Sequence, residues 1–144
     1  MFIGEYAHNL DAKGRIIIPA KFRDALNTTF ILTRGLDGCL TIYSNDQWEK
    51  IFEKLNKLPN TKKATRQYIR MLTSGATECS LDNQGRIQIP SFLSKPLNIT
   101  KECVIVGAND HIEIWDQNTW NSYYEEASES FEEVAEELSE LMSE

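Results

Sequence analysis

Two arginines that each follow an aspartate by four residues form the most chemically informative pattern in the chain. They are Arg15 after Asp11 and Arg86 after Asp82, and a glycine directly precedes each arginine. A guanidinium held on a rigid turn can contact a guanine edge through two parallel hydrogen bonds, or it can clamp a phosphate. Alternatively, each arginine pairs with its own aspartate and only holds the turn together. The residues alone leave both interpretations open.

The two motifs belong to an internal duplication. The segment 10–19 returns as 81–90 at an offset of 71 residues, with seven of ten positions identical. In each copy the aspartate can accept hydrogen bonds from nearby backbone N–H groups, and Gly14 or Gly85 can take the positive φ that a tight turn requires. A short apolar strand follows each arginine and stops at a proline, which cannot donate to a strand ladder. We therefore expect each copy to hold its arginine on a rigid hairpin.

The charge of the chain is unevenly distributed. The net charge is −7, but residues 125–144 contain nine Glu and no Lys or Arg, whereas the other 124 residues contain 15 basic and 13 acidic residues. Exposed charges farther apart than the Debye length of about 8 Å are largely screened at physiological salt. The acidic tail therefore does not exclude a nucleic-acid partner for the rest of the chain.

Other function classes find little support in the sequence. No apolar run approaches the roughly 20 residues of a membrane span, and the N-terminus lacks a signal-peptide pattern, so we expect a cytoplasmic protein without a membrane partner. Cys39, Cys79 and Cys103 form no C-x-x-C pair and fit buried free thiols. No nucleotide-binding, metalloprotease or nucleophile-elbow motif is present, which predicts no enzyme activity, no cofactor and no metal site.

The apolar pattern divides the chain into four parts. These are a first repeat over 4–48, a helical connector over 49–74, a second repeat over 75–120 and an acidic helix over 121–144. Within the last part, residues 123–142 should form one helix whose apolar stripe needs a partner surface. The stripe consists of Ala127, Phe131, Val134, Leu138 and Leu141. Pro96 should shorten or kink the helix that follows the second motif.

With both D-x-x-G-R-I-x-I-P copies and the helices between them in view, the chain resembles the MraZ family of bacterial transcriptional regulators over nearly its whole length. The resemblance implies a mainly β, α+β fold in which two AbrB-like repeats, of the swapped-hairpin or double-psi type, form one pseudo-symmetric barrel. It also implies a nucleoid-associated protein that assembles into a homo-oligomeric ring. Such a protein binds short repeated promoter boxes in double-stranded DNA and represses the division and cell-wall gene cluster, including its own gene.

The resemblance assigns roles to the motif residues. Arg15 and Arg86 become the candidates for DNA contact, with Asp11, Gly14, Asp82 and Gly85 as the support of the two motifs. The nearby basic residues are better candidates for phosphate contacts than for base readers; they are Lys13, Lys21 and Arg23. Because these three all belong to the first copy, we expect that copy to contribute more to DNA binding.

Two further interpretations stay open. The basic face between Lys62 and Arg70 is better explained as a solvated helix or a subunit contact than as a reader of the DNA groove. The alternative function is a ring-forming structural or protein-binding assembly whose acidic C-terminal helix docks a partner.

Overall fold

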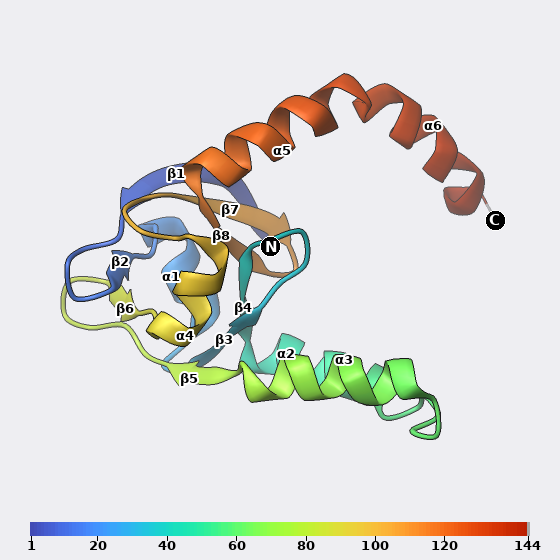
Figure 1. Ribbon diagram of the computed structural model, residues 1–144, viewed down its shortest axis with the longest axis horizontal. Helices are drawn as coiled ribbons and strands as arrows, with labels where there is room; N and C mark the ends of the chain where they lie inside the picture. The colour runs from blue at the N-terminus through green and yellow to red at the C-terminus, as the bar shows by residue number, and fades with distance from the viewer. Residues whose placement is uncertain (144) are drawn as a thin grey trace.

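The computed structural model describes residues 1–143 as eight strands in two sheets, with helices around them (Figure 1). The strands are β1 (Phe2–Asn9), β2 (Arg15–Ile17), β3 (Phe30–Arg34), β4 (Leu40–Ser44), β5 (Thr77–Cys79), β6 (Arg86–Gln88), β7 (Glu102–Asn109) and β8 (Ile112–Asp116). The α-helices are α1 (Ala20–Leu26), α2 (Asn45–Leu55), α3 (Lys63–Ser74), α4 (Ser91–Ser94), α5 (Gln117–Glu129) and α6 (Phe131–Met142). The fold is therefore α+β, as the resemblance implies, but it is mixed and not mainly β, because the helices contain more residues than the strands.

The large sheet shows the duplication directly. Its six strands run in the order β1-β7-β8-β4-β3-β5 and pair antiparallel. Exchanging each strand for its counterpart in the other repeat, β1 with β5, β3 with β7 and β4 with β8, gives the same order read from the other end. The edge strands are exchanged between repeats, because β1 pairs with β7 and β5 pairs with β3. The two repeats thus form one structural unit with a pseudo-two-fold axis between β4 and β8.

The small sheet consists of β2 and β6, one strand from each motif, paired antiparallel. The expectation of a closed barrel is wrong, because the two edge strands of the large sheet, β1 and β5, are not paired with each other. The physical reason lies in the motif strands. They pair only with each other, and Pro19 and Pro90 follow them almost at once, so neither strand can extend to join an edge of the large sheet.

The core lies between the two sheets and includes the middle of the small sheet. Ile16 pairs with Ile87 across the ribbon, and both side chains are buried. Ile18 is buried as well, whereas Ile17 is 38% exposed. The three consecutive isoleucines therefore alternate between core and solvent, as one face of a two-stranded ribbon requires, and do not form a strand buried on both faces.

The short helices after the two prolines close the core at either end. In the first repeat, α1 buries Phe22 and Leu26, and the Phe22 ring packs edge-on against Phe2 and Tyr6 at centroid distances of 5.5 and 5.4 Å. In the second repeat, α4 has only four residues and continues as a 3-10 turn over Lys95–Leu97. The prediction that Pro96 shortens this helix is confirmed.

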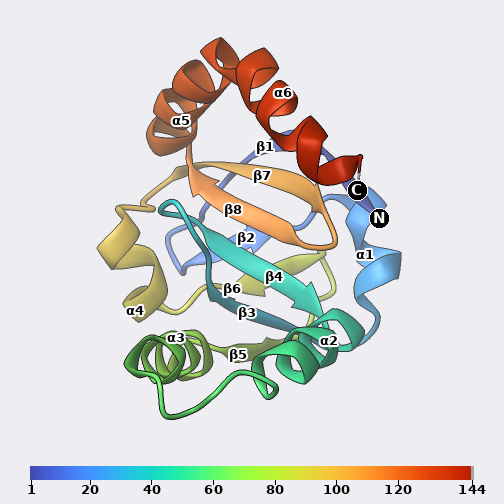
Figure 2. The same cartoon turned by 90° about the vertical axis from the view of Figure 1, so that its right-hand side faces the viewer.

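Each repeat then ends in a pair of helices. Ser44 caps α2 by accepting from the backbone N–H of Gln47, and Asp116 caps α5 by accepting from Asn118 and Thr119. Figure 2 shows α5 and α6 on one side of the sheets and α2 and α3 on the opposite side. The two pairs thus occupy equivalent places in the two repeats, as the pseudo-symmetry predicts.

The acidic C-terminal segment is two helices and not the single helix that its stripe predicts. The break is at Ser130, whose hydroxyl lies 3.4 Å from the carbonyl oxygens of both Glu126 and Ala127. A serine that donates back to the preceding turn competes with the helical ladder and bends a helix. Among residues 1–143, no helix combines the length and the apolar character that a membrane span requires.

Candidate nucleic-acid interface

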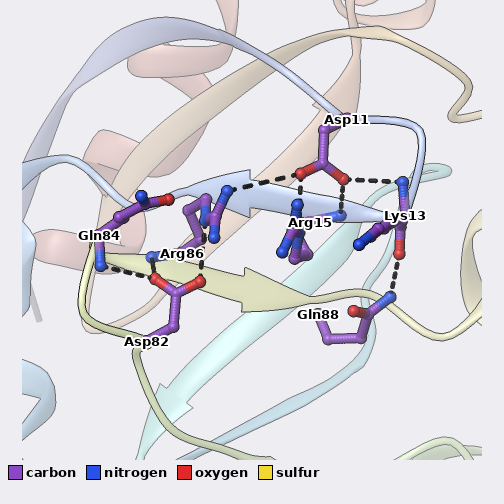
Figure 3. A network of polar contacts seen from close by, with 7 residues as sticks. All are labelled: Asp11, Lys13, Arg15, Asp82, Gln84, Arg86 and Gln88. Atoms are coloured by element: carbon purple, nitrogen blue, oxygen red, sulfur yellow. Dashed lines mark hydrogen bonds and ion pairs between the residues drawn. The ribbon is translucent and has the colours of Figure 1, made fainter.

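The two Asp-x-x-x-Arg turns have nearly identical geometry (Figure 3). Asp11 Oδ1 accepts from the backbone N–H groups of Lys13 at 2.9 Å and Arg15 at 2.8 Å, while Oδ2 accepts from Arg15 Nε at 2.8 Å. Asp82 repeats this pattern with Gln84 N and Arg86 N, both at 2.9 Å, and Arg86 Nε at 2.8 Å. Each carboxylate therefore fixes the loop and aims the guanidinium that follows it.

The glycines meet the expectation for these turns. Gly14 has φ +78° and Gly85 has φ +75°, which is the region that side chains disfavour. Each glycine N–H donates to the carbonyl of its own motif aspartate at 3.0 Å. The turns are thus held by the backbone as well as by the aspartate side chains.

Hydrogen bonding keeps both motif aspartates ionised. The backbone N–H of Arg15 lowers the pKa of Asp11, and the guanidinium and the N–H of Lys13 lower it further. The backbone N–H of Arg86 has the same effect on the pKa of Asp82. A carboxylate that accepts several N–H bonds favours its charged form. Neither aspartate is therefore suited to act as a general acid near neutral pH.

The β2–β6 ribbon places the two motifs side by side. Ile16 lies opposite Ile87, and backbone bonds join Ile18 N to Gly85 O at 2.9 Å and Ile89 N to Gly14 O at 2.8 Å. Each turn therefore supports the strand of the other repeat. Arginines 71 residues apart in sequence are brought to a single ribbon.

Both guanidinium groups are partly open to solvent. The Arg15 side chain is 30% exposed and the Arg86 side chain 23%. In each, Nε is used by the motif aspartate, and the terminal nitrogens make no hydrogen bond within residues 1–143. Such a fixed fork can donate two parallel bonds to a planar acceptor. The aspartate contact and an outside ligand are therefore compatible.

The three other predicted basic residues do not all lie at the first turn. Lys13 lies in the first turn and Lys21 on α1, both exposed. Arg23 donates through Nε to Ile18 O at 2.8 Å, and its guanidinium lies directly against Gly85 of the second turn. The expectation that all three surround Arg15 is wrong for Arg23. Because the motif strands are exchanged, α1 of the first repeat serves the second turn.

A family model described as "MraZ protein, putative antitoxin-like" matches the chain twice, over residues 1–71 and 72–141. The chain belongs to the MraZ family. The two matches divide the chain at the offset of the internal duplication, so each match contains one motif, one half of the large sheet and the helices that follow it. MraZ is a family of regulator type and not a known family of enzymes.

The structure also places the three cysteines and two of the tryptophans of this MraZ chain. The three cysteines are free and buried, and burial raises the thiol pKa of Cys39 to about 12 and of Cys79 and Cys103 to about 11. Within residues 1–143 there is no group of three or more His, Cys, Asp or Glu side chains placed to hold a metal ion. The Trp115 ring is buried and packs on the half-buried Trp120 ring at a centroid distance of 5.2 Å.

Two features of the MraZ site could not be read from the sequence. Gln88 Nε2 donates to the carbonyl of Lys13, which joins the second motif strand to the first turn. Arg86 Nη1 lies 3.8 Å from Asp11 Oδ2, an ion pair between the repeats. The only feature of the sequence that points to either contact is the duplication, because two equivalent short strands can pair with each other.

Proposed function

We propose that the protein is a sequence-specific DNA-binding transcriptional regulator that reads DNA with the β2–β6 ribbon. The observation that carries the proposal is the pair of partly exposed guanidinium groups on that ribbon, one from each repeat. Each is oriented by an aspartate through Nε, and its terminal nitrogens make no hydrogen bond within residues 1–143. A bidentate contact from arginine to a guanine edge contributes about 1–3 kcal/mol of discrimination against a wrong base.

The surrounding basic residues would position the ribbon on the DNA backbone. Lys13, Lys21 and Arg23 carry no information about base sequence in such a role, but they would set the register of the arginines. Contacts of this kind release counterions, so affinity should fall steeply as the salt concentration rises.

Self-association belongs to the same proposal. Two base-reading arginines per chain supply only a few kcal/mol of discrimination, which is at the low end of what specific regulators need. Linked subunits on repeated DNA boxes gain apparent affinity through effective concentration. A homo-oligomeric ring on repeated promoter boxes would meet this need.

Membership of the MraZ family supports the biological setting. We infer a repressor of the division and cell-wall gene cluster that also acts on its own promoter and is nucleoid-associated in the cytoplasm. The family is described as antitoxin-like, which fits a regulator.

A gel shift with the DNA upstream of the protein's own gene tests the proposal. The titration is run at two salt concentrations with excess unrelated duplex as competitor, and with a matched probe of the same length and shuffled sequence. We expect saturable binding that survives the competitor, is weaker at the higher salt concentration and is lost on the shuffled probe. Equal binding to both probes would contradict sequence-specific recognition.

A second function is favoured by a different observation, the exposed apolar stripe of α6. In that case the protein is a structural or protein-binding assembly, and the acidic C-terminal helices dock a partner. A chain that forms an oligomer but does not distinguish the two probes would support this alternative.

A further inference from the structure

The outer face of the β2–β6 ribbon carries four side chains, and the motif arginines are only two of them. Ile16 and Ile87 lie opposite each other and are buried in the core. Because successive side chains of a strand point to opposite faces, the neighbours of both isoleucines face away from the core. These neighbours are Arg15, Ile17, Arg86 and Gln88. Ile17 and Gln88 are exposed, so a molecule that contacts both arginines meets these side chains as well.

The register of the ribbon gives each arginine a different neighbour. Arg15 lies opposite Gln88, and Arg86 lies opposite Ile17. Figure 3 shows Arg15 and Gln88 toward one end of the ribbon and Arg86 toward the other. Backbone bonds join the next pair outward at each end, so both arginine pairs are of the non-hydrogen-bonded type, in which the Cα atoms are about 4.5 Å apart. Base pairs stack about 3.4 Å apart, so the two side chains of a pair can reach adjacent base pairs.

The amide of Gln88 is oriented by the first turn, as each arginine is oriented by its aspartate. Nε2 of Gln88 donates to the carbonyl oxygen of Lys13. A primary amide has two N–H donors and one acceptor oxygen, so one N–H and Oε1 remain. Neither makes a hydrogen bond within residues 1–143. An N–H and an oxygen on one amide are the groups with which glutamine contacts N7 and N6 of adenine in the major groove.

Ile17 offers only apolar groups to a ligand on this face. Its side chain is 38% exposed, so part of its apolar surface is still free to be buried. Thymine is the base that presents a methyl group in the major groove, and apolar side chains contact it there. The groove is about 12 Å wide and admits a two-stranded β-ribbon. Ile17 is therefore suited to contact a thymine.

These two residues make the halves of the ribbon different. The pseudo-two-fold axis exchanges Arg15 with Arg86 and Ile17 with Gln88, at the offset of 71 residues. A two-fold symmetric reader binds a palindromic site, because each half contacts the same bases. The two arginines alone would specify such a site. Isoleucine in one half and glutamine in the other remove the symmetry.

We propose that Gln88 reads an adenine next to the guanine contacted by Arg15, and that Ile17 reads the methyl group of a thymine next to the guanine contacted by Arg86. The inference rests on the proposed function and adds two specificity-determining residues to it. A chain that reads DNA in this way recognises a box without two-fold symmetry and binds it in one orientation. Copies bound to repeated boxes then all face in the same direction along the DNA.

Selection from a DNA library measures the base preference at each position. The library contains the DNA upstream of the protein's own gene, with the segment that the protein protects from nuclease randomised, and the bound fraction is sequenced. We expect the wild-type site to contain two guanines, each beside an A·T pair, and not to be a palindrome. Ile17→Gln gives both halves the same residues, so its selected site should be a palindrome. A palindromic wild-type site, or an unchanged site for Ile17→Gln, would overturn the inference.

Base analogues in the selected site test each contact separately. An adenine analogue with carbon in place of N7 lacks the acceptor for Gln88, and uracil lacks the methyl group of thymine, while both keep Watson–Crick pairing. The adenine analogue should weaken wild-type binding about fivefold, as expected for one hydrogen bond. Uracil should weaken it about fourfold, as expected for one methyl group that is no longer buried. Unchanged wild-type binding to either analogue would contradict the corresponding contact.

Alanine variants show whether these effects come from the two side chains. Gln88→Ala should no longer distinguish adenine from its analogue, and Ile17→Ala should no longer distinguish thymine from uracil, whereas each should stay sensitive to the other analogue. If Gln88 only ties β6 to the first turn through Lys13, Gln88→Ala will weaken binding to both duplexes equally and keep their ratio. That result would refute its role as a reader of adenine.

Gln84→Ala is the matched control for Gln88→Ala. Gln84 is an exposed glutamine in the second turn and lies outside the two ribbon strands. Its variant should keep the wild-type base preferences and the response to both analogues. The position changed by Gln88→Ala should adjoin the guanine whose preference is lost in Arg15→Ala. A position beside the guanine of Arg86 would contradict the assignment by register.

Failure of the inference can be told from failure of the proposed function. A wild type that selects no sequence contradicts the proposed function, and the inference with it. In another outcome, the wild type selects guanines that are lost in Arg15→Ala and Arg86→Ala, but it binds both analogue duplexes as well as the natural site. This outcome overturns only the roles of Ile17 and Gln88.

Discussion

Asp11 Oδ2 lies 2.8 Å from Nε of Arg15 and also 3.8 Å from Nη1 of Arg86, so one carboxylate contacts the motif arginines of both repeats. Within residues 1–143, Asp82 pairs only with its own arginine, Arg86. The pseudo-symmetry of the fold is therefore broken at its centre. Asp11 therefore lies within ion-pair distance of the guanidinium groups of both motifs.

Replacing the two aspartates should have unequal effects on DNA binding. Asp11→Asn weakens the contacts to both Arg15 and Arg86, whereas Asp82→Asn weakens the contact to Arg86 alone. We expect the larger loss of affinity for Asp11→Asn in gel-shift titrations at fixed salt. Asparagine keeps the side-chain size and one acceptor oxygen, so circular dichroism should show that both variants stay folded. Equal losses would mean that the contact between Asp11 and Arg86 does not orient the arginine.

Arg15→Ala and Arg86→Ala should each lower specific DNA affinity about 5- to 150-fold, the equivalent of the 1–3 kcal/mol of one bidentate base contact. Both side chains are partly exposed, so Tm and oligomeric state should stay near the wild-type values. Lys57→Ala removes the same charge from an exposed site beyond α2 and serves as the control. If the arginine variants bind like this control, the arginines only support their turns.

The elements follow closely from local sequence. The two motifs predict the turns and the short strands that follow them, and Pro96 predicts the shortened helix of the second repeat. The sequence could not decide whether the strands close into a barrel. The pairing of strands far apart in the chain depends on which strand edges remain free after folding. The break in the C-terminal helix depends on Ser130, whose hydroxyl donates to carbonyl oxygens of the preceding turn. The spacing of the apolar residues contains no information about this contact.

The turn that holds each motif arginine was predictable from the sequence, whereas the arrangement of the two turns relative to each other was not. The spacing of Asp11, Gly14 and Arg15 specifies a turn, because each residue acts within its own loop. The position of Arg23 against Gly85 depends on strand exchange between the repeats, a long-range property that no local spacing encodes. The sequence also predicts a stronger first site and a weaker second one, and the structure places the motif arginines of both repeats on one ribbon.

Gly85→Ala tests the position of Arg23. A Cβ atom at residue 85 would run into the Arg23 guanidinium, and φ +75° adds about 1–2 kcal/mol of backbone strain. We therefore expect Gly85→Ala to lower the free energy of unfolding, measured by urea titration, by at least the energy of this backbone strain. Arg23→Ala in the same chain should recover the steric part, so the two changes should be non-additive.

Gly14→Ala provides the matched control for this cycle. Gly14 has φ +78°, but the side-chain atom nearest to its added Cβ would be Nε2 of Gln88, at 2.9 Å. Gly14→Ala and Arg23→Ala should therefore add. Additive effects for Gly85→Ala with Arg23→Ala as well would place the Arg23 side chain away from the second turn.

His111 should make stability depend on pH near neutrality. Its Nδ1 lies 2.7 Å from Asp110 Oδ1 and its Nε2 lies 2.9 Å from Glu113 Oε2, so a ring protonated on both nitrogens can donate to both carboxylates. The hydrogen bond to Glu113 raises the pKa of His111; burial opposes this, and the contact with Asp110 adds to it. For Glu113, burial raises the pKa of the carboxyl group. Hydrogen bonds from His111 and Trp115 outweigh this effect and keep the pKa below its usual value.

The sign of the dependence follows from the raised pKa of His111. Its stabilisation is complete below the ordinary histidine pKa of 6.5 and is lost as the pH rises through the higher value in the folded protein. His111→Gln should therefore lower Tm by about 2–4 °C at pH 6, which corresponds to about 1 kcal/mol, and by less at pH 9. Glu113→Gln removes the main partner carboxylate, so the pH dependence of Tm in that variant should be weaker than in the wild type. If His111→Gln lowers Tm more at pH 9 than at pH 6, the fold stabilises the neutral imidazole and the interpretation is wrong.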